Sequence, residues 1–217
     1  GCPHFGLMAV ERYGSDSLGA VGNLMRNSPT VGEALRNVQL HLHLNDRGAA
    51  LFLLRLDPER VALCYTIFWS DTHATSLIYD AALAVAHKAL CELCGPGWKP
   101  LTVQFAHRRP AVALPYKRFF GVRPEFDAQR CAIVFASSWL DHPIAGTDPA
   151  LRDSLERAIH QLEASEPDSL AVQVRRALYP MVLSGTATLG NTARLFSLHE
   201  RTIRRRLGPL LQAVPRG

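Results

Sequence analysis

Five arginines near the C-terminus have the types and spacing that most directly suggest chemistry. They are Arg194, Arg201, Arg204, Arg205 and Arg206. Arg204 and Arg205 follow Arg201 by three and four residues, so their guanidinium groups would point outward from one face of a helix. A guanidinium can bind O6 and N7 of guanine through two hydrogen bonds, and a short helix fits the DNA major groove. The run predicts DNA binding; an ordinary solvated helix with an arginine-rich face is the alternative.

The segment that must position these arginines has the pattern of two short helices joined by a tight turn. Thr188 can cap the first helix, and apolar or small residues then recur at helical spacing to Phe196. Ser197-Leu198 would form the turn. The second helix would direct Ile203 and Leu207 inward and its arginines outward. This is the pattern of a helix-turn-helix.

Three further side chains have the types of metal ligands. His87, Cys91 and Cys94 stand at positions i, i+4 and i+7 of one predicted helix, and thiolate with imidazole suits zinc. A structural zinc site needs four ligands, however, and no second CxxC motif occurs in the chain. Cysteine is also among the residue types most often buried. We therefore predict core thiols here, with no metal and no cofactor.

The motif His107-Arg108-Arg109 could hold an anionic effector, because arginine binds a carboxylate as a fork. The preferred interpretation is that these residues stabilise a strand end and pair with nearby acids. Eight large aromatic residues are expected in the core rather than around a pocket: Phe52, Tyr65, Phe68, Trp69, Trp98, Phe105, Phe119 and Phe120. No glycine-rich phosphate loop or nucleophile motif appears. The chain is not predicted to be an enzyme.

Charge is distributed unevenly along the 217 residues. Of the 24 basic and 19 acidic residues, eight and three lie within 166–217, which leaves 16 of each in the rest. A neutral body with a basic tail is typical of a sensor domain joined to a DNA-binding one. No apolar run approaches the roughly 18 residues that span a bilayer. Five cysteines without framework spacing indicate free thiols in a reducing cytoplasm.

Residues 1–165 alternate between helical and strand patterns, which predicts an α+β domain. Thr30 to Glu33 form a capping box, and Gly95-Pro96-Gly97 ends a long, largely buried helix. The predicted helices cover 14–28, 30–42, 72–94 or 75–94, 115–120 and 148–164. The predicted strands cover 49–56, 61–69, 101–106 and 131–136, and the first two form a hairpin around Asp57-Pro58.

The run TLGNTARLFSLHERTIRRRL resembles the first helix-turn-helix of AraC/XylS-type transcription regulators. This resemblance implies that Arg201, Arg204 and Arg205 contact bases. We expect Arg194 and Arg206 to neutralise phosphates. The family carries two such units, but only ten residues follow RRRL. The chain is therefore expected to stop after the first unit.

The motifs FGL, SPTVGEAL, GPGWKPLTVQFAH and YKRFFG occur in an order similar to that of the arabinose-binding-like, ligand-sensing domain of one branch of these regulators. The resemblance covers about residues 5–164. It implies an effector-binding and dimerisation domain at 1–165, followed by an all-α, partial helix-turn-helix DNA-binding domain at 166–217. It also implies a cytoplasmic homodimer, with RNA polymerase as a partner of the full-length protein.

The predicted function is that of a bacterial transcription regulator, whose partners are a small-molecule effector and operator DNA. No membrane association is expected. The alternative is a stand-alone small-molecule-binding or catalytic α+β domain with an incidental basic tail. The effector, the operator and the sign of regulation stay open.

Overall fold

The described part of the chain combines helices with one antiparallel sheet. The computed structural model describes residues 5–10, 15–68 and 75–165, together with positions 178, 182, 190 and 201. The helices are α1 (Phe5–Val10), α2 (Gly19–Arg26), α3 (Val31–His41), α4 (Thr75–Cys94), α5 (Leu114–Phe120) and α6 (Pro149–Ser165). Short 3-10 helices are η1 (Ser15–Leu18), η2 (Leu42–Leu44) and η3 (Ser137–Asp141). The α+β class predicted for this region is confirmed. The predicted all-α domain at 166–217 lies outside the described residues except for those four positions.

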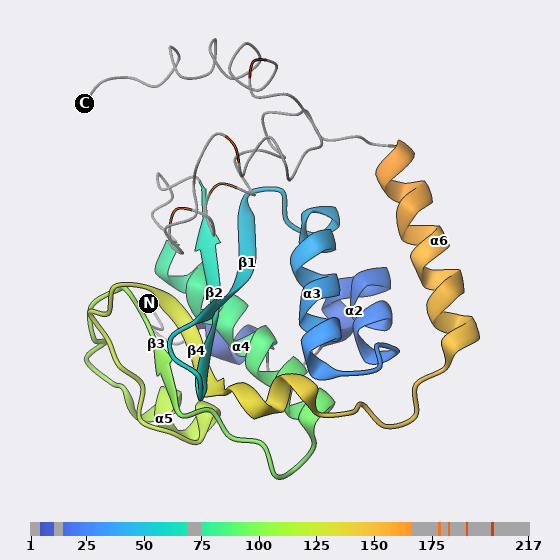
Figure 1. Cartoon of the computed structure of the whole chain (residues 1–217). Helices are drawn as coiled ribbons and strands as arrows, with labels where there is room; N and C mark the ends of the chain where they lie inside the picture. The colour runs from blue at the N-terminus through green and yellow to red at the C-terminus, as the bar shows by residue number, and fades with distance from the viewer. Residues whose placement is uncertain are drawn as a thin grey trace. The chain divides into compact units, whose positions relative to one another are not determined.

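Four strands form the sheet, in the order β1-β2-β4-β3 (Figure 1). They are β1 (Ala49–Arg55), β2 (Arg60–Ile67), β3 (Thr102–Gln104) and β4 (Cys131–Ala136). Every pairing is antiparallel, and Leu63 in the central strand β2 lies between Leu53 of β1 and Ile133 of β4. Successive residues face opposite sides of a sheet, so Leu63 enters the main core while Cys64 joins a smaller cluster on the other face. Burial of both faces explains the nearly continuous apolar runs of β2 and β4.

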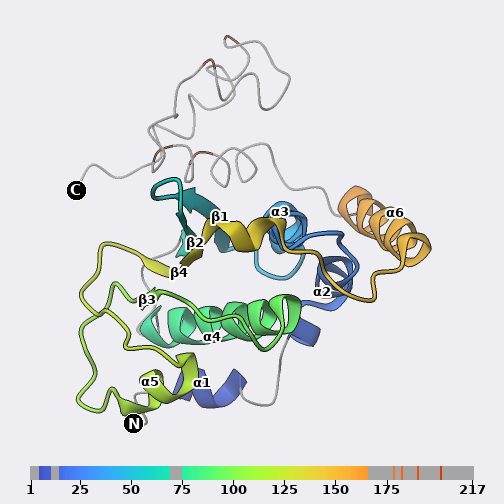
Figure 2. The ribbon, with the colours of Figure 1, turned by 60° about the horizontal axis from the view of Figure 1, so that its bottom comes forward.

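Helix α4 is the centre of the described fold. Leu83, Ala84 and Leu90 within it are fully buried. Figure 2 shows the sheet, α4 and α1 as successive layers, and α4 contacts both β2 and β4 while α1 packs against α4. This arrangement confirms the predicted central helix and explains why its sequence is apolar on more than one face.

Helix α3 begins at the predicted residue, with Thr30 Oγ1 accepting a hydrogen bond from the Glu33 N–H at 3.3 Å, while the Glu33 carboxylate lies 3.5 Å from Arg152. Its first turn also meets η3 closely: a Cβ added to Gly32 would lie 2.9 Å from the carbonyl oxygen of Leu140. Backbone bonds hold the same junction, because the Val31 N–H donates to the His142 carbonyl at 3.0 Å. The start of α3 is thus fixed against the segment that leads to α6.

The structure differs from the sequence-based expectations in three details. The first predicted helix is divided into η1 and α2 at Gly19, whose φ of +54° suits glycine. The strand expected over 101–106 contains only Thr102–Gln104. Helices α1 and η3 were not predicted from the sequence, because both are shorter than two helical turns and have little periodicity to detect. Among the described residues, no helix is long and apolar enough to cross a membrane.

The close approach at Gly32 generates a stability prediction. Gly32→Ala should lower the free energy of unfolding by about 1–2 kcal/mol, because the contacted Leu140 oxygen is backbone and must shift, although alanine favours the helix. Gly97→Ala is the matched control, since an added Cβ meets nothing within 4 Å there. Chemical denaturation midpoints measure both. Equal stability of the two variants would contradict the close packing of α3 on η3.

Candidate ligand-binding pocket

A largely apolar pocket of about 170 Å³ lies between the helices and the sheet. Its lining residues come from α2, α3, α4, β1 and β2, from the short helices η1 and η2, and from the loop after η2. The lining residues are Ser17, Leu18, Met25, Leu35, Val38, Leu42, Asn45, Asp46, Leu51, Leu63, Tyr65, Ala82, Val85, Ala86 and Ala89. The small side chains of α4 leave this space open. A cavity of about 150 Å³ holds benzene, so this pocket suits a molecule of roughly six to ten non-hydrogen atoms.

The polar groups of the pocket are held in place by the protein itself. Asp46 accepts hydrogen bonds from the Gly48 N–H at 2.8 Å and from the Tyr65 hydroxyl at 2.7 Å. Burial, and secondly the hydrogen bond to Asp46, raise the pKa of Tyr65, so its phenol stays protonated. The phenol oxygen and the carboxylate both keep lone pairs that can accept further hydrogen bonds. The pocket can therefore hold an apolar body that carries a donor group, such as an amine or a hydroxyl.

Tyr65 is one of the aromatic residues that the sequence assigned to the core. It is buried, but it also lines the pocket and packs edge-on against Tyr79, with ring centroids 5.9 Å apart. Asp46, its partner, was not singled out from the sequence. The pair is separated by 19 residues, and no local motif predicts that a loop carboxylate will meet a strand tyrosine.

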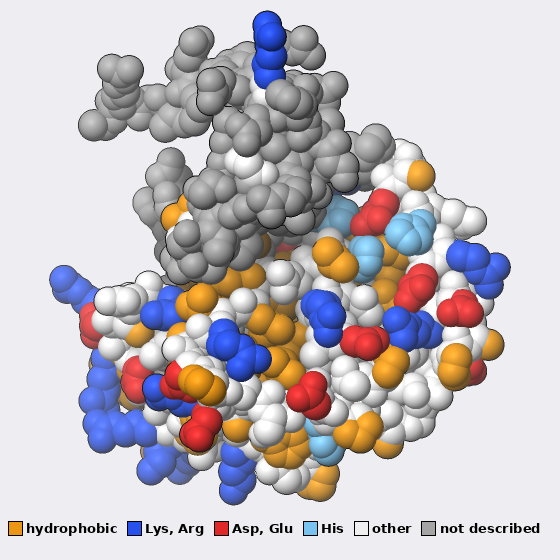
Figure 3. Space-filling model, in the orientation of Figure 1, with side chains coloured by type: hydrophobic (Ala, Val, Ile, Leu, Met, Phe, Trp, Pro, Cys, Tyr) orange, Lys and Arg blue, Asp and Glu red, His pale blue; other side chains and the backbone are white. Residues whose placement is uncertain are grey.

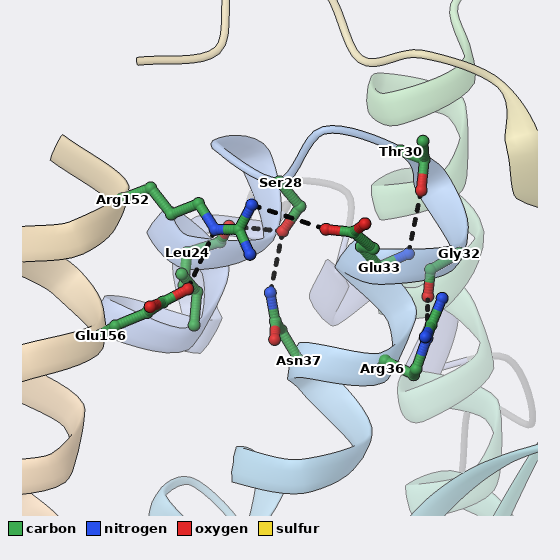
Figure 4. Close-up of polar contacts among 9 residues, drawn as sticks. All are labelled: Leu24, Ser28, Thr30, Gly32, Glu33, Arg36, Asn37, Arg152 and Glu156. Carbon is green, nitrogen blue, oxygen red and sulfur yellow. Dashed lines mark hydrogen bonds and ion pairs between the residues drawn. The ribbon is translucent and has the colours of Figure 1, made fainter. Parts of the chain in front are cut away.

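The end of α2 is tied to α3 by a buried hydroxyl, which Figure 4 shows between the two helices. Ser28 Oγ donates to the Leu24 carbonyl at 2.9 Å and accepts from Asn37 Nδ2 at 3.0 Å. Met25 of α2 and Val38 of α3, each adjacent to one of these bonded residues, line the pocket. The two helices that form one pocket wall are therefore held together by a satisfied polar contact.

Helix α6 is anchored to the same pair of helices (Figure 4). Arg152 lies 3.5 Å from Glu33 of α3 and 2.9 Å from Glu156 of α6 itself. The Asp148 N–H, just before α6, donates to Asn27 Oδ1 at 3.1 Å. One turn after Glu156, Ile159 is fully buried within the main core cluster. Helix α3 thus contributes to the pocket with Leu35 and Val38 and to the α6 contact with its first turn.

A second polar group is buried at the start of α4. Asp80 is 1% exposed, and its two oxygens lie 2.9 Å from His107 Nε2 and 2.6 Å from the Tyr116 hydroxyl. His107 Nδ1 is 3.0 Å from the Arg108 carbonyl. Both ring nitrogens therefore face acceptors, which favours the doubly protonated imidazolium. Burial lowers the pKa of His107, but its hydrogen bonds and the nearby carboxylates outweigh that effect and raise the pKa overall.

This arrangement revises the interpretation of His107-Arg108-Arg109. The expected pairing with an acid is confirmed for His107, which is bound to Asp80. Arg108 and Arg109 are exposed instead. Neither ring nitrogen of His107 is free to take a proton from a substrate, so the geometry favours a structural ion pair over a general base.

The three possible metal ligands of α4 are only partly brought together. His87 Nε2 lies 3.7 Å from Cys91 Sγ, while Cys94 is buried. Burial lowers the pKa of His87 to about 4 and raises the pKa of Cys94 to about 12. Protonated thiols are poor ligands and nucleophiles. Within the described residues, no group of three or more His, Cys, Asp or Glu side chains is placed to hold a metal ion.

The arginines predicted to contact DNA lie almost entirely outside the described residues. Arg201 is helical and exposed. Arg194, Arg204, Arg205 and Arg206 are not described, so their assignment stays a prediction.

Comparison with known proteins gives consistent matches. Residues 1–144 match the family model described as the arabinose-binding domain of AraC transcription regulators, N-terminal. The ornithine utilization regulator of Pseudomonas aeruginosa is 26% identical over 212 residues, which are 97% of this chain and 62% of that protein. The chain thus spans less than two thirds of that relative.

Among solved structures, the transcriptional regulator CdpR from Pseudomonas aeruginosa is similar, with a TM-score of 0.62. The match covers 95% of this chain and 68% of the CdpR chain. At 18% sequence identity, this match supports the fold alone.

The Asp80–His107 pair predicts a pH-dependent stability. Because the folded-state pKa of His107 is raised above 6.5, the pair's stabilisation is complete below about pH 6.5 and is lost as the pH rises through the folded pKa. In His107→Gln the amide can still donate to Asp80 but does not titrate, so this decline in the melting temperature should disappear. His142→Gln, a half-buried histidine elsewhere, should keep the wild-type profile. An unchanged profile in His107→Gln would exclude the pair as its cause.

Proposed function

Because the chain belongs to the family defined by the arabinose-binding domain of AraC transcription regulators, we propose that it is a bacterial transcription regulator that senses a small-molecule effector and binds operator DNA. The observation that carries this proposal is the family match over residues 1–144, within which the pocket lies. We assign effector binding and dimerisation to residues 1–165 and DNA binding to residues 166–217. RNA polymerase would be a partner of the full-length protein.

The apolar pocket is the proposed effector site. Its lining favours a compact, largely apolar molecule with one hydrogen-bond donor group. The Asp46 carboxylate and the Tyr65 oxygen would accept hydrogen bonds from that group. The relative's name concerns ornithine, which carries two ammonium groups and a carboxylate. No Lys or Arg is among the described residues lining this pocket, so that carboxylate would be buried without a cationic partner. We therefore expect an effector other than ornithine in this pocket.

DNA binding is proposed for the arginines of the helix-turn-helix. Arg201, Arg204 and Arg205 would contact base edges, and Arg194 and Arg206 would contact phosphates. The alternative function, a stand-alone small-molecule-binding or catalytic α+β domain, predicts the same ligand binding without preference for any DNA sequence.

Filling the pocket tests the effector site. Ala86 lines it from α4, and Ala86→Leu would occupy part of its space. Benzylamine, which joins a ring to one ammonium group, should raise the melting temperature of the wild type; at about ten times Kd, binding stabilises by about 1.4 kcal/mol. Ala86→Leu should lose this shift, whereas Ala158→Leu, an exposed α6 position, should keep it. A benzylamine shift that persists in Ala86→Leu would place the ligand elsewhere.

Substitution of single arginines tests the DNA contacts. Arg204→Ala should cost about 1–3 kcal/mol on a selected operator and relax the preference at one base pair. Arg206→Ala should weaken binding to all sequences about equally and reduce its salt dependence. Arg216→Ala, which lies within 166–217 but after the predicted helix-turn-helix run that ends at Leu207, is the control. Fluorescence anisotropy titrations on operator and scrambled duplexes measure the difference. Uniform weakening by both substitutions would contradict the base-contact assignment.

A further inference from the structure

A polar groove of about 610 Å³ lies at the β3 edge of the sheet, away from the apolar pocket. Its walls come from three segments: the loop after β3, helix α5 and the loop of residues 121–130. Three cationic residues line it, one from each segment: Arg109, Lys117 and Arg123. The groove shares no lining residue with the apolar pocket, and its volume is in the range of sites for small ligands.

The loop that supplies Arg123 is fixed by backbone hydrogen bonds. The Glu125 N–H donates to the Val103 carbonyl, and the Phe105 N–H donates to the Glu125 carbonyl, each at 2.8 Å. The Asp127 N–H donates to the His107 carbonyl at 3.0 Å. This segment therefore runs beside β3, so one wall of the groove is formed before any ligand binds.

Aromatic packing and the buried Asp80 fix the remaining walls. Phe126 stacks on Phe105 with ring centroids 5.5 Å apart and packs edge-on against Tyr116 of α5 at 5.4 Å. Tyr116 and His107 are both bonded to Asp80 of α4. The loop carrying Arg109 and the helix carrying Lys117 are consequently attached to the central helix, and their cationic side chains start from a rigid base.

The three cations outnumber the two acids in the described lining of the groove. Among the described residues, Arg109, Lys117 and Arg123 form no ion pair with an acid. Of the two acids in the lining, Glu125 accepts a hydrogen bond from Gln104 at 2.8 Å, and Asp127 lies close enough to His107 to raise its pKa. Each acid therefore also contacts another polar side chain, and the lining keeps an excess of positive over negative charge for a ligand.

The segment that forms the groove also carries a net positive charge. Residues 99–130 contain seven basic and two acidic residues. Figure 3 shows Lys and Arg side chains gathered at the end of the molecule formed by β3 and α5. Arginine and lysine together are the usual ligands of carboxylate and phosphate groups.

We propose that this groove binds a small multivalent anion, a di- or tricarboxylate or a phosphorylated metabolite, at a site separate from the apolar pocket. Arg109, Lys117 and Arg123 hold its anionic groups, while Leu114 and Phe126 contact its carbon skeleton. A DNA backbone fits less well, because the site is concave and carries Glu125 and Asp127, which repel a continuous row of phosphates. This proposal does not depend on the effector assigned to the apolar pocket.

Lys117 and Arg118 allow a matched test, because they are adjacent on α5, both are exposed, and only Lys117 lines the groove. Citrate and inorganic pyrophosphate are titrated into the full chain by calorimetry at constant ionic strength. At least one should bind, and Lys117→Gln and Arg123→Gln should each weaken that binding about tenfold, the loss expected for one charge-assisted contact. Arg118→Gln should change it less than about twofold. Unchanged circular dichroism confirms that each variant is folded.

Three results would overturn the proposal. The first is that neither probe binds. The second is that all three substitutions weaken binding equally, which indicates general charge attraction. The third is that no substitution weakens binding, which places the anion on the arginines of 166–217. A random 20-bp duplex is titrated in parallel, in about the length range of a DNA site. If Lys117→Gln and Arg123→Gln weaken duplex binding while citrate and pyrophosphate fail to compete with the duplex, the groove is a DNA contact and not a metabolite site.

Discussion

The buried carboxylate of Asp80 is the interaction on which the β3 side of the fold depends. A carboxyl side chain that is 1% exposed is tolerated only when its oxygens are paired, and here His107 and Tyr116 pair both of them. These partners come from the loop after β3 and from α5, two segments with little regular structure of their own. Removing the carboxylate would release both segments from α4. The same contact therefore stabilises the domain and shapes the proposed anion groove.

Much of the local structure could be predicted from the sequence, because its signals are local. The capping box at Thr30, the helix stop after Cys94 and the strand Cys131–Ala136 all occur where expected. The order of the strands in the sheet could not be predicted, because it depends on contacts between distant segments. The same holds for the pairs Asp80–His107 and Asp46–Tyr65, whose members are 27 and 19 positions apart. The pocket could not be predicted from the sequence either. It is lined by alanines of α4 and by Tyr65, and no sequence motif indicates that small side chains will leave a cavity.

Averaged charge was the least informative sequence signal for the N-terminal region. Its 16 basic and 16 acidic residues suggested a neutral body, yet residues 99–130 hold seven of the bases and only two of the acids. The rest of that region is correspondingly acidic. Electrostatic potential depends on where charges gather in space rather than on their sum. Once the fold brings the loop after β3, α5 and the loop of 121–130 together, a neutral average becomes a cationic groove.

The contacts between α3 and α6 limit how an occupied pocket can influence the rest of the chain under the proposed function. Allosteric coupling typically amounts to about 1–3 kcal/mol. The Arg152–Glu33 pair is 3.5 Å long with side chains 29% and 39% exposed, so it contributes about 0–1 kcal/mol.

That ion pair alone is too weak to transmit the signal. The buried Ile159 and the hydrogen bond from the Asp148 N–H to Asn27 are better suited, because they lose packing or a partner when α6 moves relative to α2 and α3. A ligand that spreads Met25 from Val38 would strain the Ser28–Asn37 contact first. The ligand would thereby act on α2 and α3, which hold α6, and this effect does not require a change in the Arg152–Glu33 ion pair.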